Sequence, residues 1–454
     1  MQKPLVALLD QAVAALLHAE PRQLVALVEQ HGSPLNVVWP HILRQNVEAL
    51  RAVLRAHDVR HEIFYGAKVN KSQALVRAAV QADAGVDVSS VYELRDALRA
   101  GVDPARVVAT GPAKTRVFHA ELLACGALIS VDSCEELAAL EAALAGPARA
   151  RALARVLLRY RPESNRNSRF GMDATALQHC LQRLAALRGA VTFEGFHCHL
   201  GGYAWETRVQ AIRELAASVA AARELDLPPR MLDIGGGLPV RYVDGDAYDE
   251  FLPAQEPADY RTGRVPTSYY PYGGRTDAAT WLHNVLAAPI GDGRTVAQYL
   301  NAERLVLALE PGRSLVDQAA VTAFRVTQVK ALADGKHVVF VEGSSFSACE
   351  TWFGSEFLVD PVLLPADPER AEDGAPCAAQ FAAYIAGHSC LDDDVITNRI
   401  LDFDRRPAPG DLLVYANTAG YQMDLLENEF HRHPMPRRIV VHVNARGAME
   451  FSPD

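Results

Sequence analysis

Paired cysteines are absent from this sequence of 454 residues. Its 7 cysteines are scattered, and none forms a C-x-x-C pair of the kind that builds a zinc site or a disulfide framework. This absence excludes a disulfide-stabilised secreted domain. The pattern is typical of reduced thiols, and we therefore expect a cytoplasmic location.

Long apolar runs and an excess of positive charge are also lacking. The apolar residues of the N-terminus fall at helical spacing but are interrupted by Asp10 and Gln11, unlike the core of a signal peptide. No other stretch is long and apolar enough to cross a bilayer. Lys and Arg total 45 against 55 Asp and Glu, a net charge of -10, which disfavours nucleic acid and anionic membranes as partners. We expect a small-molecule partner.

The sequence does contain an alternation of short β-rich runs with alanine- and leucine-rich stretches of helical spacing. This pattern predicts a parallel sheet covered by helices, and eight such units predict a closed (β/α)8 barrel of the TIM type. The eight runs are 62–67, 85–89, 106–110, 128–132, 155–160, 191–199, 230–234 and 304–309. Helix-like segments such as 91–100 and 174–187 lie between them.

The rest of the chain predicts a second domain. After Arg313 the pattern changes to β-like segments at 321–332, 336–341, 412–416 and 438–443, typical of a mainly antiparallel sandwich or barrel-like domain. We assign 41–318 to the barrel, and 1–40 with 319–454 to a β domain that carries an N-terminal helical extension. The stretch 240–300 is too long for one connection, so it should hold the seventh helix and an insertion at the strand ends.

Reactive groups of such barrels follow the strands, at their C-terminal ends. Lys68 follows the first run, and a desolvated lysine has a lowered pKa and attacks an aldehyde more readily. The alternative is a surface lysine. His197 and His199 follow the sixth run at a spacing that suits metal ligands, yet no nearby Asp, Glu or Cys set completes a metal site. His199 is better explained as a plate against a planar cofactor, with a structural histidine as the alternative.

The last two runs end in groups that suit a phosphate. Gly235, Gly236 and Gly237 follow the seventh run, and their backbone N–H groups can close around an oxyanion, although such a triplet is usually a turn. Glu310 and Arg313 follow the eighth run. Arginine suits a phosphate and a carboxylate can hold a proton on a ring nitrogen, while a surface ion pair is the commoner fate of such neighbours. Together these groups are what pyridoxal 5'-phosphate requires.

From about Gly32 to Phe430 the sequence resembles the fold-type-III pyridoxal-phosphate decarboxylases, the group of diaminopimelate, ornithine and biosynthetic arginine decarboxylases. The motifs occur in that family's order: FYGAKVN, GVDVSSVYEL, TGPAK, VDSCEEL, SRFG, HCHLGG, LDIGGG and EPGR. The resemblance implies an alanine-racemase-like fold and a Schiff base between the cofactor and Lys68. The other implied cofactor contacts are Asp87, Arg159, His199, Gly235, Gly236, Gly237, Glu310 and Arg313.

The resemblance extends into the β domain. GHSCLDDD resembles the family's G-P-x-C-x-x-x-D motif, so Cys390 and Asp394 would reach the substrate from the partner subunit of a homodimer with shared active sites. ANTAGYQMD resembles the family's G-A-Y motif and makes Tyr421 a further cofactor or phosphate contact. Outside the GHSCLDDD motif, Cys390 would be interpreted as an inert buried thiol.

Departures from the family pattern bear on the substrate. Leu391 stands where the family usually has an acid that touches the far end of the substrate. The arginine of the R-P-x-L-Y motif of the diaminopimelate enzymes is missing from VEGSSFSACETWF. We therefore do not expect meso-diaminopimelate or a simple basic amino acid. Gly202 replaces a serine that is frequent near the phosphate, and Ala419 and Gly420 reverse the usual Gly-Ala before Tyr421.

The predicted reaction is the decarboxylation of an amino acid. The substrate would displace Lys68 from the cofactor, Glu310 would keep the ring nitrogen protonated, and the Cys390 thiol would protonate the carbanion. An amino-acid racemase or epimerase on the same fold stays open as an alternative, as does a non-catalytic pyridoxal-phosphate-binding protein, which would lack the β domain. A regulatory subunit would normally have lost the lysine or the cysteine.

Overall fold

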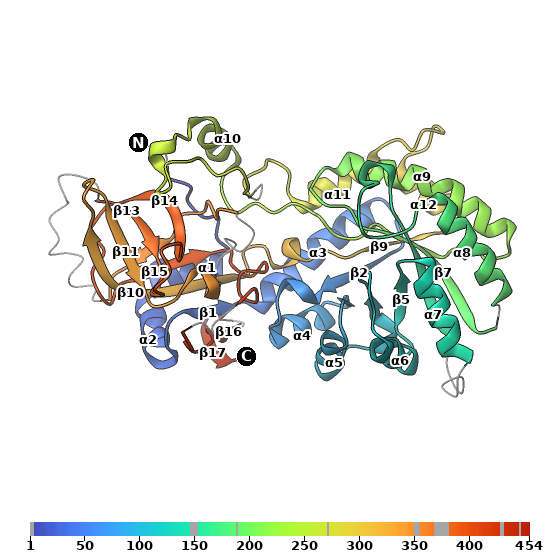
Figure 1. The fold of residues 1–454 in the computed structure, drawn as a ribbon, viewed down its shortest axis with the longest axis horizontal. Coiled ribbons are helices and arrows are strands. Elements are labelled where there is room, and N and C mark those ends of the chain that lie inside the picture. The colour runs from blue at the N-terminus through green and yellow to red at the C-terminus, as the bar shows by residue number, and fades with distance from the viewer. Residues whose placement is uncertain are drawn as a thin grey trace. The chain divides into compact units, whose positions relative to one another are not determined.

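The computed structural model describes residues 4–145, 153–187, 189–269, 272–348, 355–366, 381–426, 431–444 and 446–454. Two compact units are present (Figure 1). The barrel unit comprises Arg44–Leu238 and Ala278–Leu315, and the sheet unit comprises Met1–Leu43, Pro239–Asp277 and Val316–Asp454. Among the helices described, none has the length and apolar character needed to span a membrane.

Eight parallel strands of the barrel unit close a barrel in chain order. They are β2 (His61–Gly66), β3 (Gly85–Val88), β4 (Val107–Ala109), β5 (Leu128–Val131), β6 (Ala154–Tyr160), β7 (Val191–Cys198), β8 (Met231–Asp233) and β9 (Val306–Leu309). Every predicted run is confirmed, and no end differs by more than two residues. Every residue of β3, β4 and β5 is buried, because helices cover one side of each strand and the barrel interior covers the other.

Helices surround these strands (Figure 1). They are α3 (Pro40–Ala56), α4 (Gln73–Gln81), α5 (Val91–Arg99), α6 (Arg116–Cys125), α7 (Cys134–Ala145), α8 (Ala174–Ala186), α9 (Trp205–Glu224), α11 (Ala278–Ala287) and α12 (Val296–Ala302). Short side chains set several of their starts: Ser72, Ser90 and Thr115 each accept a backbone N–H at the first turn of α4, α5 and α6. The predicted helices at 91–100 and 174–187 are confirmed as α5 and α8.

Packed side chains fill the barrel interior. The buried cluster there consists of Phe64, Val108, Leu128, Leu157 and Ala308. The barrel is therefore a solid core with its polar groups at the strand ends, and not a pore.

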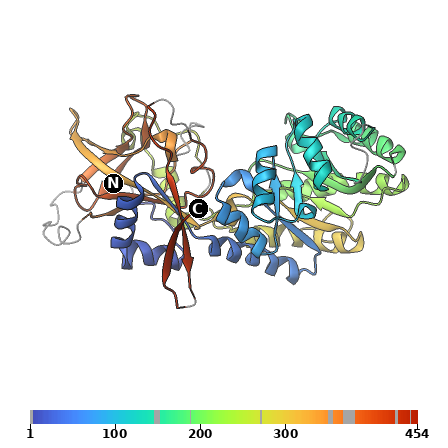
Figure 2. The same cartoon turned by 90° about the horizontal axis from the view of Figure 1, so that it is seen from below.

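A nine-stranded sheet forms the sheet unit, with the main order β14-β13-β11-β10-β1-β16-β17; β15 also pairs with β10, and β12 with β15. The strands are β1 (Leu35–Val38), β10 (Ala320–Ala331), β11 (His337–Val341), β12 (Val362–Leu364), β13 (Phe381–Ala386), β14 (Val395–Phe403), β15 (Leu412–Ala416), β16 (Arg437–Val443) and β17 (Met449–Pro453). The four predicted segments are confirmed as β10, β11, β15 and β16. Most pairs are antiparallel, and β16 and β17 form a long ribbon (Figure 2).

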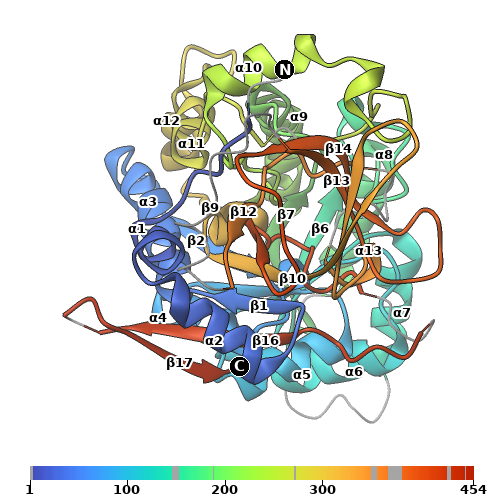
Figure 3. The same ribbon diagram turned by 90° about the vertical axis from the view of Figure 1, so that its left-hand side faces the viewer.

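The sequence pattern missed β1, which lies at the centre of this sheet. It pairs antiparallel with β10 and parallel with β16 (Figure 3). Four residues are too few for a periodic signal, and both partners come from the C-terminal part of the chain. The N-terminal extension is helical in α1 (Gln11–Ala14), a π turn (Ala15–Ala19) and α2 (Pro21–His31), but Leu5 precedes these helices and is buried in the sheet-unit core.

The stretch assigned to the barrel at 240–300 divides between the two units. Its first part, Pro239–Asp277, groups with the sheet unit. The cause is aromatic packing, because Tyr242 and Tyr272 stack with ring centroids 5.0 Å apart and Tyr272 meets Phe357 edge-on. The helix α10 (Gly245–Ala254) also contributes to this core. In the barrel unit the remaining part forms α11 and α12; Tyr270 lies outside the described residues.

Candidate active site

A cavity of about 540 Å³ lies at the C-terminal ends of the barrel strands. It is lined by Lys68, Ser89, Thr110, Gly111, Pro112, Ala113, Lys114, Arg159, Asn165, Ser168, Phe170, His197, His199, Gly201 and Glu310. Parallel strands deliver these side chains to one end of the barrel although the residues lie far apart in sequence. The sequence-predicted residues Lys68, Arg159, His199 and Glu310 are thereby brought together.

Lys68 lies in a short 3-10 turn directly after β2 and forms an ion pair. Its Nζ is 2.7 Å from Oδ2 of Asp87, and Oδ1 of Asp87 accepts a hydrogen bond of 2.6 Å from the Thr110 hydroxyl. Burial raises the pKa of Asp87, although Lys68 opposes this shift. The lysine was expected to be desolvated, but its side chain is 36 % exposed and charge-paired. Asp87 therefore orients the amine at the cavity, a contact that sequence spacing alone does not provide.

Glu310 follows β9 and lies between two histidines. Its Oε2 is 3.5 Å from Nε2 of His197 and 3.4 Å from Nδ1 of His199, and Nδ1 of His197 is 2.7 Å from the Ser130 hydroxyl. Burial favours the neutral acid, but His197, His199 and Lys68 outweigh it and hold the pKa of Glu310 well below its usual range. Glu310 is therefore a carboxylate near neutral pH.

The two histidines have a carboxylate partner that sequence reasoning did not find. His197, His199 and Glu310 place their ligand atoms within 4.8 Å of one another, so they form a three-residue set of the kind that could hold a metal ion. The expectation that no acid completes this set was therefore wrong, because Glu310 arrives from a strand more than one hundred residues away. Burial lowers the pKa of His199 to about 4, so its ring is neutral near pH 7.

Asp233, the last residue of β8, is a buried acid that the sequence analysis missed. Its Oδ1 accepts the Gly235 N–H at 2.8 Å, while its Oδ2 has no hydrogen-bond partner among the described residues. Burial, and then the nearby Glu310, raise the pKa of Asp233 well above its usual value. The signal was available in LDIGGG, since an aspartate can accept the backbone N–H of the residue two positions further on and so fix a turn there.

The three N–H groups of the glycine triplet are not all free to hold an anion, unlike in the cradle that the sequence predicts. The Gly235 N–H donates to Asp233, and the Gly236 N–H lies 3.3 Å from Nδ1 of His199. Gly235 and Gly237 adopt φ values of 69° and 80°, a region in which glycine is favoured. The N–H groups of Gly235 and Gly236 thus bond within the protein, and an anion would use the N–H of Gly237.

Two further basic groups line the wall of the cavity. Arg159 pairs with the buried Asp132 at 2.8 Å, and its guanidinium lies 4.7 Å from the Phe170 ring centroid. Lys114 is 1 % exposed and its Nζ is 2.9 Å from Oε1 of Glu136. The sequence pattern marked TGPAK only as a motif and did not assign Lys114 a partner. Arg313 begins a 3-10 turn (Arg313–Val316) and is buried, but it is not among the cavity-lining residues.

The other predicted site residues belong to the sheet unit. Cys390 is exposed, and its Sγ lies 3.2 Å from Nε2 of His431. Leu391 is 42 % exposed. Asp394 is buried, and its two carboxylate oxygens accept N–H groups of Ser345 and Ser389 at 2.6 and 2.9 Å, so it anchors the loop that carries Cys390. Tyr421 follows β15 with a φ of 75°.

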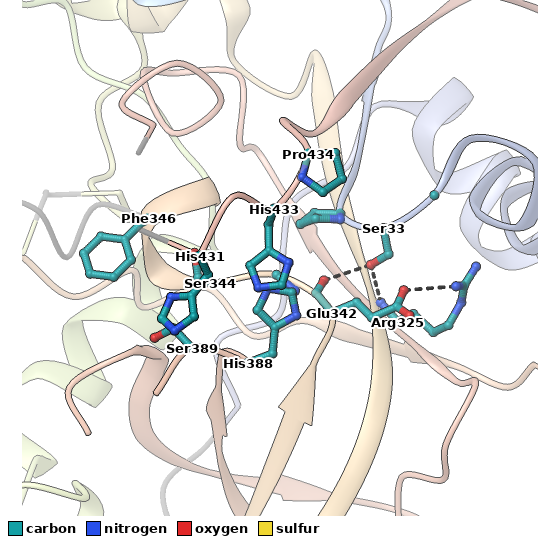
Figure 4. Close-up of a pocket in the computed structure, with 13 residues that line it drawn as sticks. Ser33, Arg325, Glu342, Ser344, Phe346, His388, Ser389, His431, His433 and Pro434 are labelled. Carbon is teal, nitrogen blue, oxygen red and sulfur yellow. Dashed lines mark hydrogen bonds and ion pairs between the residues drawn. The ribbon is translucent and has the colours of Figure 1, made fainter. Parts of the chain in front are cut away.

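A cavity of about 440 Å³ lies beside this loop (Figure 4). Three of its lining residues are histidines: the rings of His388 and His433 stack with centroids 3.8 Å apart, and His431 lies next to His433 at 6.0 Å. Burial lowers the pKa of His388. The Arg325 guanidinium at the opposite side pairs with Glu342 at 3.0 Å. The residues of VEGSSFSACETWF after Ala348, including Trp352, lie outside the described residues.

Comparison with known proteins places this site in a family. The family model described as "Pyridoxal-dependent decarboxylase, pyridoxal binding domain" matches residues 42–256. A relative from Sinorhizobium fredii, with the name "Uncharacterized protein y4yA", is 56 % identical over 98 % of this chain and 96 % of its own length. The chain belongs to the pyridoxal-dependent decarboxylases. A diaminopimelate decarboxylase from Bacillus methanolicus is 24 % identical over 92 % of this chain and 90 % of its own.

This member of the decarboxylase family has the same fold as solved structures. A crystal structure of diaminopimelate decarboxylase from M. jannaschii superposes with a TM-score of 0.72 at 19 % identity, and covers 95 % of this chain and 92 % of the other. The predicted fold, a TIM barrel with a β-sandwich-like domain, is confirmed. Pyridoxal phosphate is the cofactor of this family, and the site fits it: Oε1 of the buried Glu310 has no hydrogen-bond partner among the described residues and can accept a ring N–H.

Proposed function

We propose that this protein removes the α-carboxylate of an amino acid in a pyridoxal-phosphate-dependent reaction. The observation that carries the proposal is the presence in one cavity of the Lys68 amine and the Glu310 carboxylate, the two groups that hold the cofactor at its aldehyde and at its ring nitrogen. When bound, pyridoxal phosphate supplies an electron sink for the pair of electrons that the departing carboxylate leaves behind.

The residues around Glu310 keep the protons where this chemistry needs them. Because its pKa lies well below the usual range, Glu310 stays ionised and would hold a proton on the ring nitrogen of the bound cofactor. His199 has a pKa of about 4 and is neutral, so it offers a flat face without adding charge. Asp87 holds the Lys68 amine at 2.7 Å and directs it into the cavity.

Cys390 is the proton donor in this proposal. It is exposed on a loop that Asp394 anchors, and the imidazole of His431 lies 3.2 Å from its sulfur. We assign the donor to a second copy of the chain, so that the working unit is a homodimer in which each barrel receives Cys390, Leu391 and Tyr421 from its partner. A thiol beside an imidazole is a competent acid because the imidazole can take up and return the proton.

The substrate in this proposal lacks a positive charge at its far end. Leu391, 42 % exposed beside Cys390, offers apolar surface and no counter-ion for a distal ammonium group. Meso-diaminopimelate and the simple basic amino acids would leave such an ammonium group unpaired, at a cost in affinity. An amino acid with an uncharged or larger side chain fits better.

The test compares Lys68→Ala with Lys71→Ala, since both lysines follow β2 and Lys71 pairs instead with Glu93 at 2.7 Å. Wild type and Lys71→Ala should bind pyridoxal phosphate with the absorbance of a lysine-linked cofactor and release carbon dioxide from at least one member of a panel of amino acids. Lys68→Ala should lose both signals. Loss of optical rotation without carbon dioxide would instead identify a racemase, and a cofactor-loaded protein inert toward the whole panel would sink the proposal.

A further inference from the structure

Arg208, in the first turn of α9, is a charged side chain with 0 % exposure. Its guanidinium donates to two acceptors that are near it in sequence, the Ala204 carbonyl at 3.3 Å and the Thr207 hydroxyl at 3.1 Å. No carboxylate pairs with it within the described parts of the chain. Charged groups are almost never fully buried without a counter-ion, so this arginine requires an explanation.

The guanidinium gathers backbone carbonyls from two separate loops. Nη2 of Arg208 donates to the carbonyls of Leu200 at 2.6 Å, Gly202 at 2.9 Å and Gly236 at 3.2 Å, and Nη1 reaches the carbonyl of Gly201 at 3.3 Å. One loop follows β7 and the other follows β8. Burial lowers the pKa of Arg208, and the four carbonyl dipoles compensate part of that cost.

The contacts also leave no room for a side chain at Gly237. A Cβ built there would lie 2.1 Å from Nη2 of Arg208 and 2.9 Å from the Gly202 carbonyl oxygen. The ring of Trp281, on α11, is also near the guanidinium, with its centroid 5.7 Å from Cζ of Arg208. The arginine is therefore locked in place and cannot move without moving both loops.

Because these carbonyls point toward Arg208, the N–H groups of the same peptide bonds point away from it. In a trans peptide the carbonyl of one residue and the N–H of the next point in opposite directions. The carbonyls of Leu200, Gly201 and Gly236 face Arg208, so the N–H groups of Gly201, Gly202 and Gly237 face away from it. None of these three N–H groups has an acceptor among the residues that the structure describes, and Gly201 lines the Lys68 cavity.

We propose that Arg208 is the positioning residue of an anion site for the phosphate ester of the cofactor. It sets both glycine loops so that their free N–H groups converge on the phosphate, and the phosphate in turn is the anionic counter-charge that Arg208 lacks among the described residues. The inference rests on the proposed function only in taking pyridoxal phosphate as the ligand. Arg208 itself does not touch the phosphate.

The experiment measures equilibrium binding of two probes to the apoprotein by their absorbance: pyridoxal phosphate, and pyridoxal, which lacks the phosphate. The variants are Arg208→Met and Arg208→Lys, and the matched control is Arg213→Met on the same helix, whose guanidinium donates to the Pro289 carbonyl. Arg208→Met should weaken pyridoxal phosphate binding by about 10- to 100-fold, the value of a charge-assisted interaction, and leave pyridoxal binding within about 3-fold. Arg213→Met should change neither.

A merely structural role of Arg208 predicts another result, because a distorted barrel would weaken the binding of both probes equally. Equal losses for the two probes, or no loss for either, would overturn the inference. If Arg208→Met does not fold, Arg208→Lys decides: a lysine keeps the charge but cannot reach four carbonyls, so pyridoxal phosphate alone should bind about 5-fold or more weakly. Binding does not require turnover, so wild-type protein that binds the cofactor but releases no carbon dioxide refutes the proposed reaction and leaves this inference standing.

Discussion

Removal of the buried Lys114 ammonium tests how the cavity wall is held together. Its Nζ donates to the carbonyls of Gly111 at 2.9 Å and Ser130 at 2.6 Å and to Oε1 of Glu136 at 2.9 Å. With side chains 1 % and 7 % exposed, the pair is buried. Lys114→Met keeps the apolar stem and deletes the charge, and so strands a buried carboxylate.

The loss of unfolding free energy expected for Lys114→Met depends on the hydrogen bonds that Glu136 retains. Breaking a buried pair by removing one partner costs about 3–5 kcal/mol. Glu136 keeps the His119 ring nitrogen at 2.9 Å and the Asp132 N–H at 2.7 Å, so the lower end, about 3 kcal/mol, is expected. As a control, Lys71→Met removes a partly exposed pair and should cost less than about 1 kcal/mol.

The assay is urea denaturation of the apoprotein, followed by circular dichroism at pH 7 and at pH 4. Burial raises the pKa of Glu136, but His119 and Lys114 outweigh it and the pKa is lowered. Its contribution is therefore present above the unfolded value of about 4.3 and lost as the pH falls through the folded value. In Lys114→Met the loss should begin at a higher pH. The reasoning is refuted if Lys114→Met stays within about 0.5 kcal/mol of wild type at pH 7, the range of an ordinary surface change.

Three further predictions concern the site and its support. Gly195→Ala places a Cβ 1.9 Å from a carbonyl oxygen of β8 at a φ of 144° and should lower the free energy of unfolding in urea by about 3 kcal/mol. The control Gly101→Ala, whose Cβ would have no atom within 4 Å, should lower it by about 1 kcal/mol, and equal losses would contradict this prediction. Glu310→Gln removes the carboxylate that we propose as the partner of the ring nitrogen. It should lower carbon dioxide release about 100-fold with the cofactor still bound, and full activity would exclude that role. His431→Phe removes the imidazole 3.2 Å from the Cys390 sulfur and should slow alkylation of that thiol by iodoacetamide roughly tenfold at pH 7; an unchanged rate would show that the pair does not activate the thiol.

Local patterns were sufficient to locate the barrel strands and the lysine. Strand periodicity and the helical stretches between strands depend on neighbours in sequence, and the eight barrel strands were found within two residues of their ends. The order of the motifs was likewise enough to place Lys68, His199 and Glu310 at strand ends. The short strand β1 was missed because its stability comes from β10 and β16, which lie almost three hundred residues or more away.

The sequence by itself determined which residues the strands deliver to one end of the barrel, because strand position and side-chain chemistry are properties of short segments. Only the tertiary structure decided the partners: Asp87 for Lys68, His197 and His199 for Glu310, and the loop carbonyls for Arg208. Those contacts join residues from different strand–helix units, and closure of the barrel brings them within hydrogen-bond range. The exposure of Lys68, the ionisation of Glu310 and the absence of a described counter-ion for Arg208 all follow from that closure and not from any local motif.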